Sequence, residues 1–208
     1  MARYTGAVCR LCRRSGEKLM LKGERCAGPK CAVERRSGPP GPRAARFKRL
    51  SDRGIQLREK QKARYIYGVL ERQFRRFFAN AEKRVGVTGE TLVVMLERRL
   101  DNVVYRLGFA DSRSQARQLV QHGHIVLNGR RTNIPSFLVK AGDTITWREG
   151  STKTEYYKQV LESIKSKSVS NWLSLDRERL VGQVLSLPAR NDIDTKLEIE
   201  HVVEYYSR

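Results

Sequence analysis

The chain lacks the long apolar runs that membrane-spanning and secreted proteins carry. No stretch approaches the roughly 20 apolar residues that a membrane span needs. The N-terminus has no apolar segment of the signal-peptide kind. Acidic side chains are also few, with 22 Asp and Glu against 42 Lys and Arg. A soluble, cytoplasmic protein without a membrane partner is expected.

Recognisable catalytic motifs are absent as well. The sequence contains no Walker phosphate loop, no Gly-x-Gly-x-x-Gly fingerprint and no HExxH motif. It has three histidines: His122 and His124 flank Gly123, and His201 falls on the apolar face of a predicted C-terminal strand. Because of its place on the apolar face, we expect His201 to be a core residue. None of the three histidines has a Ser, Cys or Asp partner at motif spacing, so we expect the protein not to be an enzyme.

Positive charge dominates the composition, with a formal net charge of +20. The first 50 residues carry 14 basic and 3 acidic side chains, whereas residues 151–208 carry nine of each. So many like charges destabilise a compact monomer unless a polyanion neutralises them. Nucleic acid is therefore the expected partner, bound mainly by the N-terminal half. A solvated basic surface that binds any polyanion is the alternative interpretation of the charge alone.

All four cysteines lie within the first 31 residues. Two residues separate Cys9 from Cys12, four separate Cys26 from Cys31, and thirteen lie between the pairs. Two close pairs across a short loop are typical of a structural zinc site. Basic neighbours favour the thiolate form, and the segment is too polar to fold by burial alone. The spacing therefore predicts a bound Zn²⁺ that replaces a missing core.

Other interpretations of the cysteines remain open. They include two disulfides, four unrelated free thiols, and an iron–sulfur cluster, which four thiolates can also hold. Catalytic zinc keeps an open coordination position, and four cysteines without nearby histidines or paired carboxylates leave none. A structural Zn²⁺ is the expected cofactor, with the iron–sulfur cluster as the alternative.

Residues 112–123 predict a short basic helix. Ser112 and Gln115 fit a capping box, and Gly123 lies where a left-handed C-terminal cap is expected. Arg113 and Arg117 are four residues apart, so we expect them to project together from a polar face that is free to bind.

A tight hairpin is predicted directly after this helix. Residues 125–127 form a strand-like run, Asn128-Gly129 is the commonest two-residue hairpin signal, and Arg130 and Arg131 follow on the return strand. Cationic side chains and exposed backbone N–H groups then meet at one edge. Such an edge suits a bent phosphate backbone better than a small metabolite.

The rest of the chain alternates between helical and strand patterns. Proline excludes a regular helix in residues 37–50, which we interpret as a basic arm, with a plain linker as the alternative. The aromatics Phe74, Phe77 and Phe78 are expected in the core, with stacking on bases as the alternative. The pattern predicts helices over residues 51–67, 71–84, 88–107 with a break near Arg98 or Arg99, and 155–164, and strands around 145–147, after 164, and over 197–205.

These elements predict an α+β fold. It comprises an N-terminal zinc knuckle and basic arm, a helical domain, and a small helix-plus-sheet RNA-binding module with a C-terminal segment that packs back on the body. The 39% of hydrophobic residues are enough for a core. The expected domains are residues 1–49 for the knuckle and arm, 50–97 for the helical domain, 98–160 for the module, and 161–208 for the C-terminal segment.

The sequence as a whole resembles a known family, the bacterial ribosomal protein S-four, which is the fourth protein of the small ribosomal subunit. The resemblance covers nearly all 208 residues and includes the four cysteines of the metal-binding type within that family. It is carried by residues 1–4 (MARY), 57–62 (LREKQK), 67–74 (YGVLERQF), 99–109 (RLDNVVYRLGF), 115–120 (QARQLV), 126–130 (VLNGR), 172–173 (WL) and 206–208 (YSR).

This resemblance implies a structural constituent of the small subunit. A primary rRNA-binding protein would nucleate assembly at a multi-helix junction in the 5′ domain of the rRNA and contribute to translational accuracy. Its neighbours would be protein five of the small subunit, protein three, and mRNA where it enters the ribosome. It would not be a homo-oligomer, and some members of the family repress their own mRNA.

Site residues follow from the resemblance together with the charge. The metal ligands would be Cys9, Cys12, Cys26 and Cys31. The RNA-binding residues would be Arg3, Arg10, Arg13, Arg14, Arg35, Arg36, Arg43, Arg46, Lys48, Arg49, Arg58, Lys60, Lys62, Arg64, Arg72, Arg113, Arg117, Gln118, His122, His124, Asn128, Arg130 and Arg131.

Two other functions are compatible with parts of the sequence. An RNA-modifying enzyme can use the same helix and hairpin as an adaptor, and a zinc-dependent DNA-binding regulator is favoured by the knuckle alone. One departure from the family is visible: the usual Pro-Gly-Gln-His-Gly of the arm is here PGPRA at residues 40–44.

Overall fold

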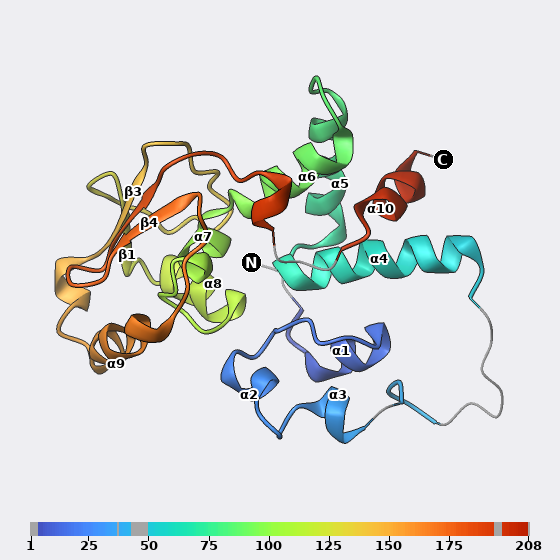
Figure 1. Ribbon diagram of the computed structural model, residues 1–208, viewed down its shortest axis with the longest axis horizontal. Coiled ribbons are helices and arrows are strands. Elements are labelled where there is room, and N and C mark those ends of the chain that lie inside the picture. Colours follow the sequence, from blue (N-terminus) through green and yellow to red (C-terminus); the bar gives the residue numbers. More distant parts are fainter. Residues whose placement is uncertain (1–3, 37, 43–49, 194–196, 208) are drawn as a thin grey trace. The chain divides into compact units, whose positions relative to one another are not determined.

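The computed structural model describes residues 4–36, 38–42, 50–193 and 197–207, which form two compact units (Figure 1). Unit 1 comprises residues 1–92 and 195–208, and unit 2 comprises residues 93–194. Five of the predicted RNA-binding residues lie outside the described residues: Arg3, Arg43, Arg46, Lys48 and Arg49.

Three short helices form the N-terminal part of unit 1. They are α1 (Cys9–Ser15), α2 (Glu24–Ala27) and α3 (Ala32–Arg35). Gly16 ends α1 in the left-handed conformation, with φ of 76°, which glycine adopts without a steric penalty. Few side chains of this segment are buried, and three of them are cysteines.

Helix α4 (Asp52–Tyr67) begins and ends at the residues that the sequence predicts. The backbone N–H of Gly54 donates to the Ser51 side chain at 3.3 Å, and Gly68 closes the helix in the left-handed region with φ of 61°. The prediction of this helix is confirmed. An N-terminal serine cap and a C-terminal glycine act within a few residues, so the sequence alone shows where the helix begins and ends.

Helix α5 (Glu71–Glu82) follows and supplies aromatic side chains to the core of unit 1. Phe74 and Phe78 are buried, as predicted, whereas Phe77 is only half-buried. The ring of Tyr206 lies 4.8 Å from that of Phe78, centre to centre.

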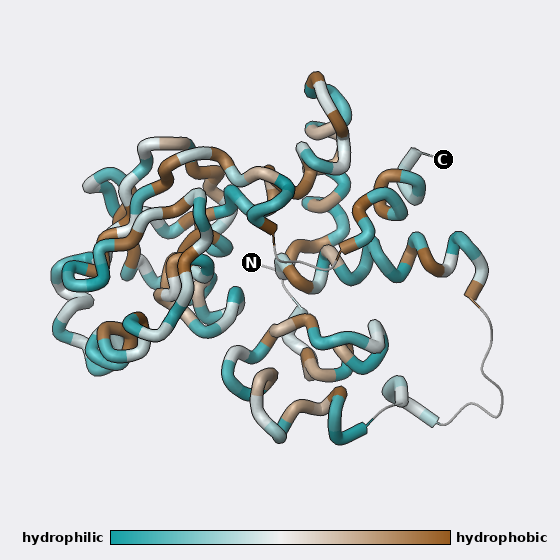
Figure 2. The backbone as a smooth tube through the Cα atoms, viewed as in Figure 1, coloured by the Kyte–Doolittle hydropathy of each residue, from teal (hydrophilic) through white to brown (hydrophobic). Residues whose placement is uncertain are grey.

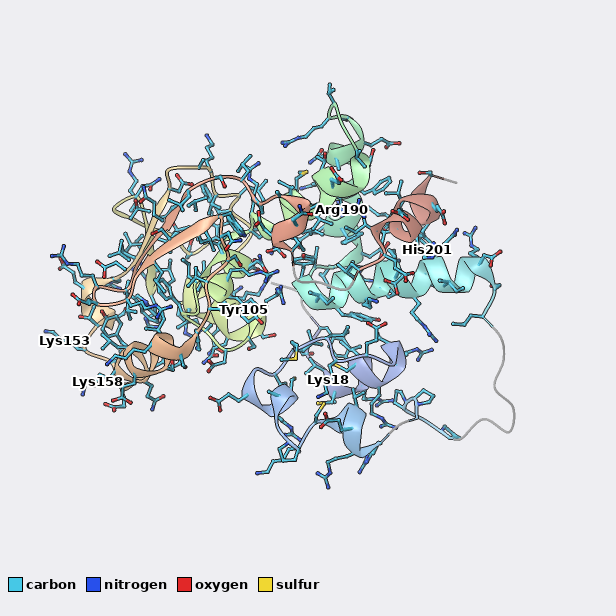
Figure 3. The ribbon with its side chains drawn as sticks, viewed as in Figure 1. Lys18, Tyr105, Lys153, Lys158, Arg190 and His201 are labelled. Atoms are coloured by element: carbon cyan, nitrogen blue, oxygen red, sulfur yellow. The ribbon has the colours of Figure 1, made fainter. Side chains whose placement is uncertain are left out.

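The predicted C-terminal strand is wrong: residues 199–206 form a helix, α10 (Ile199–Tyr206), which packs along α4 (Figure 1). Val202 is its buried residue, and Gln56 on α4 donates to Glu204 at 2.8 Å. The apolar residues satisfy a 3.6-residue period as well as a two-residue one, and packing on α4 selects the helix. His201 is consequently not a core residue but lies between Glu198 and Glu204 on the exposed side (labelled in Figure 3).

The predicted helix over residues 88–107 is broken near Arg98 and Arg99, as the sequence indicates. It divides into α6 (Thr88–Glu97) and α7 (Leu100–Arg106). The backbone N–H of Leu100 donates to the carbonyl of Phe137 at 2.8 Å. A non-local segment thus takes over the amide that a continuous helix would have satisfied internally.

A five-stranded antiparallel sheet forms one side of unit 2, with the strand order β2-β1-β3-β5-β4. The hairpin and the strand after Gly142 are found where the sequence predicts them, and two of the strand-like segments predicted after residue 164 without bounds are strands. The strands are β1 (Ile125–Leu127), β2 (Arg130–Arg131), β3 (Thr144–Trp147), β4 (Leu173–Asp176) and β5 (Val181–Val184).

Helices α7, α8 (Arg113–Gln121) and α9 (Glu155–Ser163) pack with this sheet around one core. Short 3₁₀ helices at Glu149–Ser151, Ile164–Ser166 and Arg190–Asp192 complete the element list. Figure 2 shows apolar residues along the strands and helices of the unit. The fully buried members of the core include Leu100, Val103, Leu107, Phe109, Val120, Ile125, Ile145 and Leu180.

Candidate nucleic-acid interface

The helix and hairpin of unit 2 are held by local signals that the sequence predicts. Ser112 caps α8 by accepting from the backbone N–H of Gln115 at 3.3 Å, although the Gln115 side chain accepts from Asp111 and does not complete a capping box. Gly123 has φ of 71°, and a Cβ atom there would collide with the guanidinium of Arg131. Only glycine allows the Arg131 side chain to lie across the helix end.

Asn128 and Gly129 form the hairpin turn with φ of 50° and 75°. The Asn128 side chain was predicted to contact RNA, but both ends of its amide are engaged within the protein. It donates to Asp143 at 2.8 Å and accepts from the backbone N–H of Thr144 at 2.8 Å. In this structure Asn128 fixes the hairpin to the next strand.

Cationic side chains gather at the edge that this hairpin creates. We define the cationic edge as His122, His124, Arg130, Arg131 and Arg148. The three arginines are exposed, and none forms an ion pair with a carboxylate in the described part of the chain. His124 is half-buried, and its Nδ1 lies 2.9 Å from the Ser151 hydroxyl. The edge is thus a cluster of positive charge without internal compensation, which suits a polyanion.

The pKa of His124 reflects this environment. Burial lowers it most, and the positive charges of His122, Arg148 and Arg131 lower it further. His201 differs, because its hydrogen bond to Glu204 raises its pKa.

An NMR titration of the three imidazoles should therefore place the pKa of His124 below its ordinary value near 6.5 and that of His201 above it. The stability that neutral His124 contributes is present above the unfolded pKa and is lost as the pH falls through the folded one. The stability that protonated His201 contributes is fully present below its pKa in the unfolded chain, and it is lost as the pH rises through its pKa in the folded protein. A measured pKa of His124 above that of His201 would contradict the effects assigned to burial and positive charge at His124 and to Glu204 at His201.

The prediction that Arg113 and Arg117 share a free face is wrong for Arg117. Its side chain is buried, and Nη1 lies 3.2 Å from Asp101 Oδ2. Arg99 is also buried and pairs with the same carboxylate, through Nη2 at 2.9 Å and Nε at 3.1 Å. Two buried guanidinium groups thus share one buried carboxylate, which makes Arg117 part of the core.

Arg113 is half-buried and is held by its neighbours. Its Nε donates to Asn102 Oδ1 at 2.7 Å, and its guanidinium lies 4.5 Å from the centre of the Tyr105 ring (Tyr105 is labelled in Figure 3). Asn102 in turn donates to the buried Glu97 at 2.6 Å. Of the predicted residues on α8, Gln118 remains exposed.

In unit 1, the predicted free lysines of α4 are also buried. Lys60 lies 2.9 Å from Glu71, and Lys62 lies 3.0 Å from Glu59 and 3.1 Å from Glu17, with each lysine side chain 4% exposed. The sequence pattern shows the cations of α4 but not that carboxylates from other segments would cover them. Lys60 and Lys62 therefore hold the unit together in place of a free basic face.

Arg64 is similarly engaged, with Nη1 2.9 Å from Glu71 and 2.7 Å from Gln61. Arg13 is half-buried and donates to the carbonyls of Gly38 and Pro39. The remaining described arginines that we predicted in unit 1 are exposed: Arg10, Arg14, Arg35, Arg36, Arg58 and Arg72.

Three of these exposed arginines line a groove in unit 1. The groove has a volume of about 630 Å³, and Arg10, Arg14 and Arg58 share its walls with Tyr4 and Tyr65. Guanidinium groups beside aromatic rings suit a nucleic-acid strand, because the cations meet phosphates and the rings stack on bases. Neither tyrosine stands out in the sequence as an RNA-binding residue, since only the fold brings residue 4 beside α4.

The four cysteines converge in the N-terminal segment as free thiols, and the predicted alternative of two disulfides is not what the structure shows. Cys12, Cys26 and Cys31 are buried. Burial raises the pKa of Cys12 most, and the proximity of the other three sulfurs raises it further. The backbone N–H of Lys22 donates to the sulfur of Cys26 at 3.3 Å. Sulfur atoms of this segment are visible near Lys18 in Figure 3.

The described residues nevertheless contain no group of three or more His, Cys, Asp and Glu side chains arranged to hold a metal ion. The donor chemistry fits Zn²⁺, because four thiols share a segment with little apolar burial. The structure thus shows four free thiols in one short segment, without an arrangement that would hold a metal ion.

Within the described ranges, every helix falls short of the length and apolar character needed to cross a membrane.

Comparison with known proteins agrees with this geometry. The family described as "Ribosomal protein S4/S9 N-terminal domain" matches residues 3–97, and the family described as "S4 domain" matches residues 98–145. The chain is 58% identical to the small ribosomal subunit protein uS4 of Dehalococcoides mccartyi (strain CBDB1), over 208 residues and 100% of both chains. It is 55% identical to the proteins of that name from Halothermothrix orenii and Pelotomaculum thermopropionicum, again over 100% of both chains.

These matches and the helix–hairpin unit define a ribosomal RNA-binding protein built around an S4 domain. The chain belongs to the ribosomal protein uS4 family. It is a structural, non-enzymatic component of the small ribosomal subunit that binds rRNA, and it works on the ribosome in the cytoplasm.

Proposed function

We propose that the protein nucleates small-subunit assembly by bracing a multi-helix junction in the 5′ domain of the rRNA. The observation that supports this most directly is the cationic edge, where Arg130, Arg131 and Arg148 have no carboxylate partners among the described residues. The groove of unit 1 offers a second basic surface. Two separate basic surfaces on one chain can each contact a segment of the RNA.

Recognition through these surfaces would depend on RNA shape and phosphate position. Arginine guanidinium groups on an exposed edge contact phosphates, which carry no sequence information directly. Tyr4 and Tyr65 add stacking surfaces for unpaired bases in unit 1. The buried cations Arg117, Lys60 and Lys62 do not contact RNA in this proposal, because each is paired with a carboxylate inside the protein. The exposed arginines of the cationic edge and of the groove bind the phosphates instead.

Replacing Arg130 and Arg131 together by Ala should weaken binding of a 5′-domain transcript and lower the slope of log K against log salt by about two phosphate contacts. The measurement is equilibrium filter binding over a series of salt concentrations. Both side chains are exposed strand residues, so the fold should be unchanged.

The matched control removes two exposed cations elsewhere, Lys165 and Arg179, near the opposite edge strand of the sheet. Both double variants lose the same charge, so a general electrostatic effect would lower the two slopes equally. An unchanged slope for the Arg130/Arg131 variant would refute the assignment of the cationic edge to RNA.

We further propose that Cys9, Cys12, Cys26 and Cys31 hold a structural Zn²⁺, as in the four-cysteine members that the sequence resembles. The support is the spacing of the four cysteines in the sequence, their state as free thiols, and the small apolar core around them. When bound, the ion would fix the three short helices relative to one another. An iron–sulfur cluster is the alternative occupant.

The proposed neighbours on the ribosome are protein five and protein three of the small subunit, and mRNA where it enters. The resemblance to the family supports all three neighbours. The basic arm also supports the contact with mRNA, because Arg46, Lys48 and Arg49 add positive charge to the arm. Charge reversal of these three arm residues should reduce the ability of ribosomes to unwind structured mRNA if the arm faces it.

A further inference from the structure

A small pocket opens in unit 2 beside the cationic edge. Its volume is about 270 Å³, just below the roughly 300–1,000 Å³ of sites that take drug-sized ligands. One heterocyclic ring fits such a space, whereas a larger metabolite does not. Leu119, Trp147 and Tyr156 form its apolar and aromatic lining.

The aromatic lining is fixed in place. The rings of Trp147 and Tyr156 lie 6.1 Å apart, centre to centre, and the Tyr156 hydroxyl donates to the carbonyl of Phe109 at 2.9 Å. Trp147 is nine-tenths buried, and its indole N–H has no acceptor among the described residues. Because the indole nitrogen is itself fully buried, the pocket offers a base the Trp147 ring rather than this N–H donor.

The remaining lining of the pocket is polar and joins the cationic edge. Gln118 is exposed and has an amide that can both donate and accept, and His122 and His124 line the pocket and belong to the edge. The positive charges of Arg131 and Arg148 act on His124. An aromatic cavity is therefore continuous with a surface that attracts phosphate.

We propose that this pocket receives the base of one unpaired nucleotide of the bound RNA, with Gln118 on the base edge and the neighbouring phosphate on Arg131 and Arg148. The inference rests on the proposed rRNA-binding function. A stacked, paired base cannot reach the pocket, whereas a bulged or loop nucleotide enters at little unstacking cost. The pocket would therefore select RNA with an unpaired nucleotide at one position.

The test compares Gln118→Phe with Ser114→Phe. Both add a phenyl ring at an exposed position of α8, one turn apart, but only residue 118 lines the pocket. Stacking of one base in a protein site corresponds to about tenfold in affinity. Gln118→Phe should therefore weaken binding of a 5′-domain transcript about tenfold with an unchanged salt slope, and Ser114→Phe should bind as the unmodified protein does.

Chemical probing of base edges with dimethyl sulfate and carbodiimide then locates the base. At saturating protein, one unpaired nucleotide should be protected in the complexes of the unmodified protein and of Ser114→Phe, and reactive in that of Gln118→Phe. Equal affinities and identical protection patterns for the two variants would overturn the pocket while leaving rRNA binding intact. Failure of the unmodified protein to bind the transcript would instead overturn the proposed function itself.

Discussion

Replacing Asp101 by Asn should lower the free energy of unfolding by about 3–5 kcal/mol. The Asp101 carboxylate is 4% exposed and pairs with Arg99 and Arg117, which are 1% and 6% exposed. The substitution keeps the size of the side chain but leaves two buried guanidinium groups facing a neutral amide. Removing one member of a buried ionic group costs far more than removing a surface pair, because the remaining charges stay desolvated.

The measurement is urea denaturation, with the midpoint and slope fitted separately. Asp111→Asn is the matched control, because Asp111 pairs with Lys167 at 2.7 Å in a partly exposed position. That exposed pair should account for less than about 1 kcal/mol. Equal losses for the two variants would show that the buried group does not stabilise unit 2 as the geometry indicates.

The full-length protein, purified under reducing conditions, should contain one Zn²⁺ per chain, and removal of the ion should unfold residues 9–35. Structural zinc in small peptides contributes on the order of 10 kcal/mol of apparent binding free energy. The N-terminal segment buries few apolar side chains, with Leu11 and Leu19 as its buried leucines, so it has little else to hold it. Elemental analysis gives the stoichiometry, and hydrogen exchange of α1 to α3 reports the unfolding.

Cys12→Ser should abolish stoichiometric binding, whereas Ser15→Ala, at a buried position of the same helix, should retain the ion. Visible absorption characteristic of an iron–sulfur cluster would identify the alternative occupant. If the metal-free protein showed the same exchange rates before and after addition of Zn²⁺, the zinc proposal would fail.

Local signals in the sequence account for most of the elements. The caps at Ser51 and Ser112 and the turn at Asn128-Gly129 act within a few residues, so they are visible without knowledge of the fold. A break near Arg98 or Arg99 is also predicted, although the structure stabilises it through a non-local bond, from the Leu100 N–H to the Phe137 carbonyl. Residues 199–206 were misassigned because their apolar residues fit two periods, and only contact with α4 decides between them.

The candidate site was predictable in its charge but not in its burial. Arg130 and Arg131 follow a tight turn, and a turn at the surface leaves them exposed. Lys62 resembles any other basic helix residue, and its partner Glu17 lies 45 positions away in the sequence. A basic residue on a predicted helix can therefore bind RNA or hold the fold together, and only the position of distant carboxylates distinguishes the two.

The arrangement of unit 1 has a consequence for how the chain acquires its structure during translation. Gln56 and Glu204 form a hydrogen bond although they lie 148 positions apart in the sequence. At about 5–20 residues per second, α10 leaves the ribosome on the order of ten seconds after α4. Unit 2 is synthesised within that interval and is complete first. The nascent α4 therefore spends those seconds without α10, and any chaperone or RNA that reaches it then meets a surface that the finished protein no longer presents.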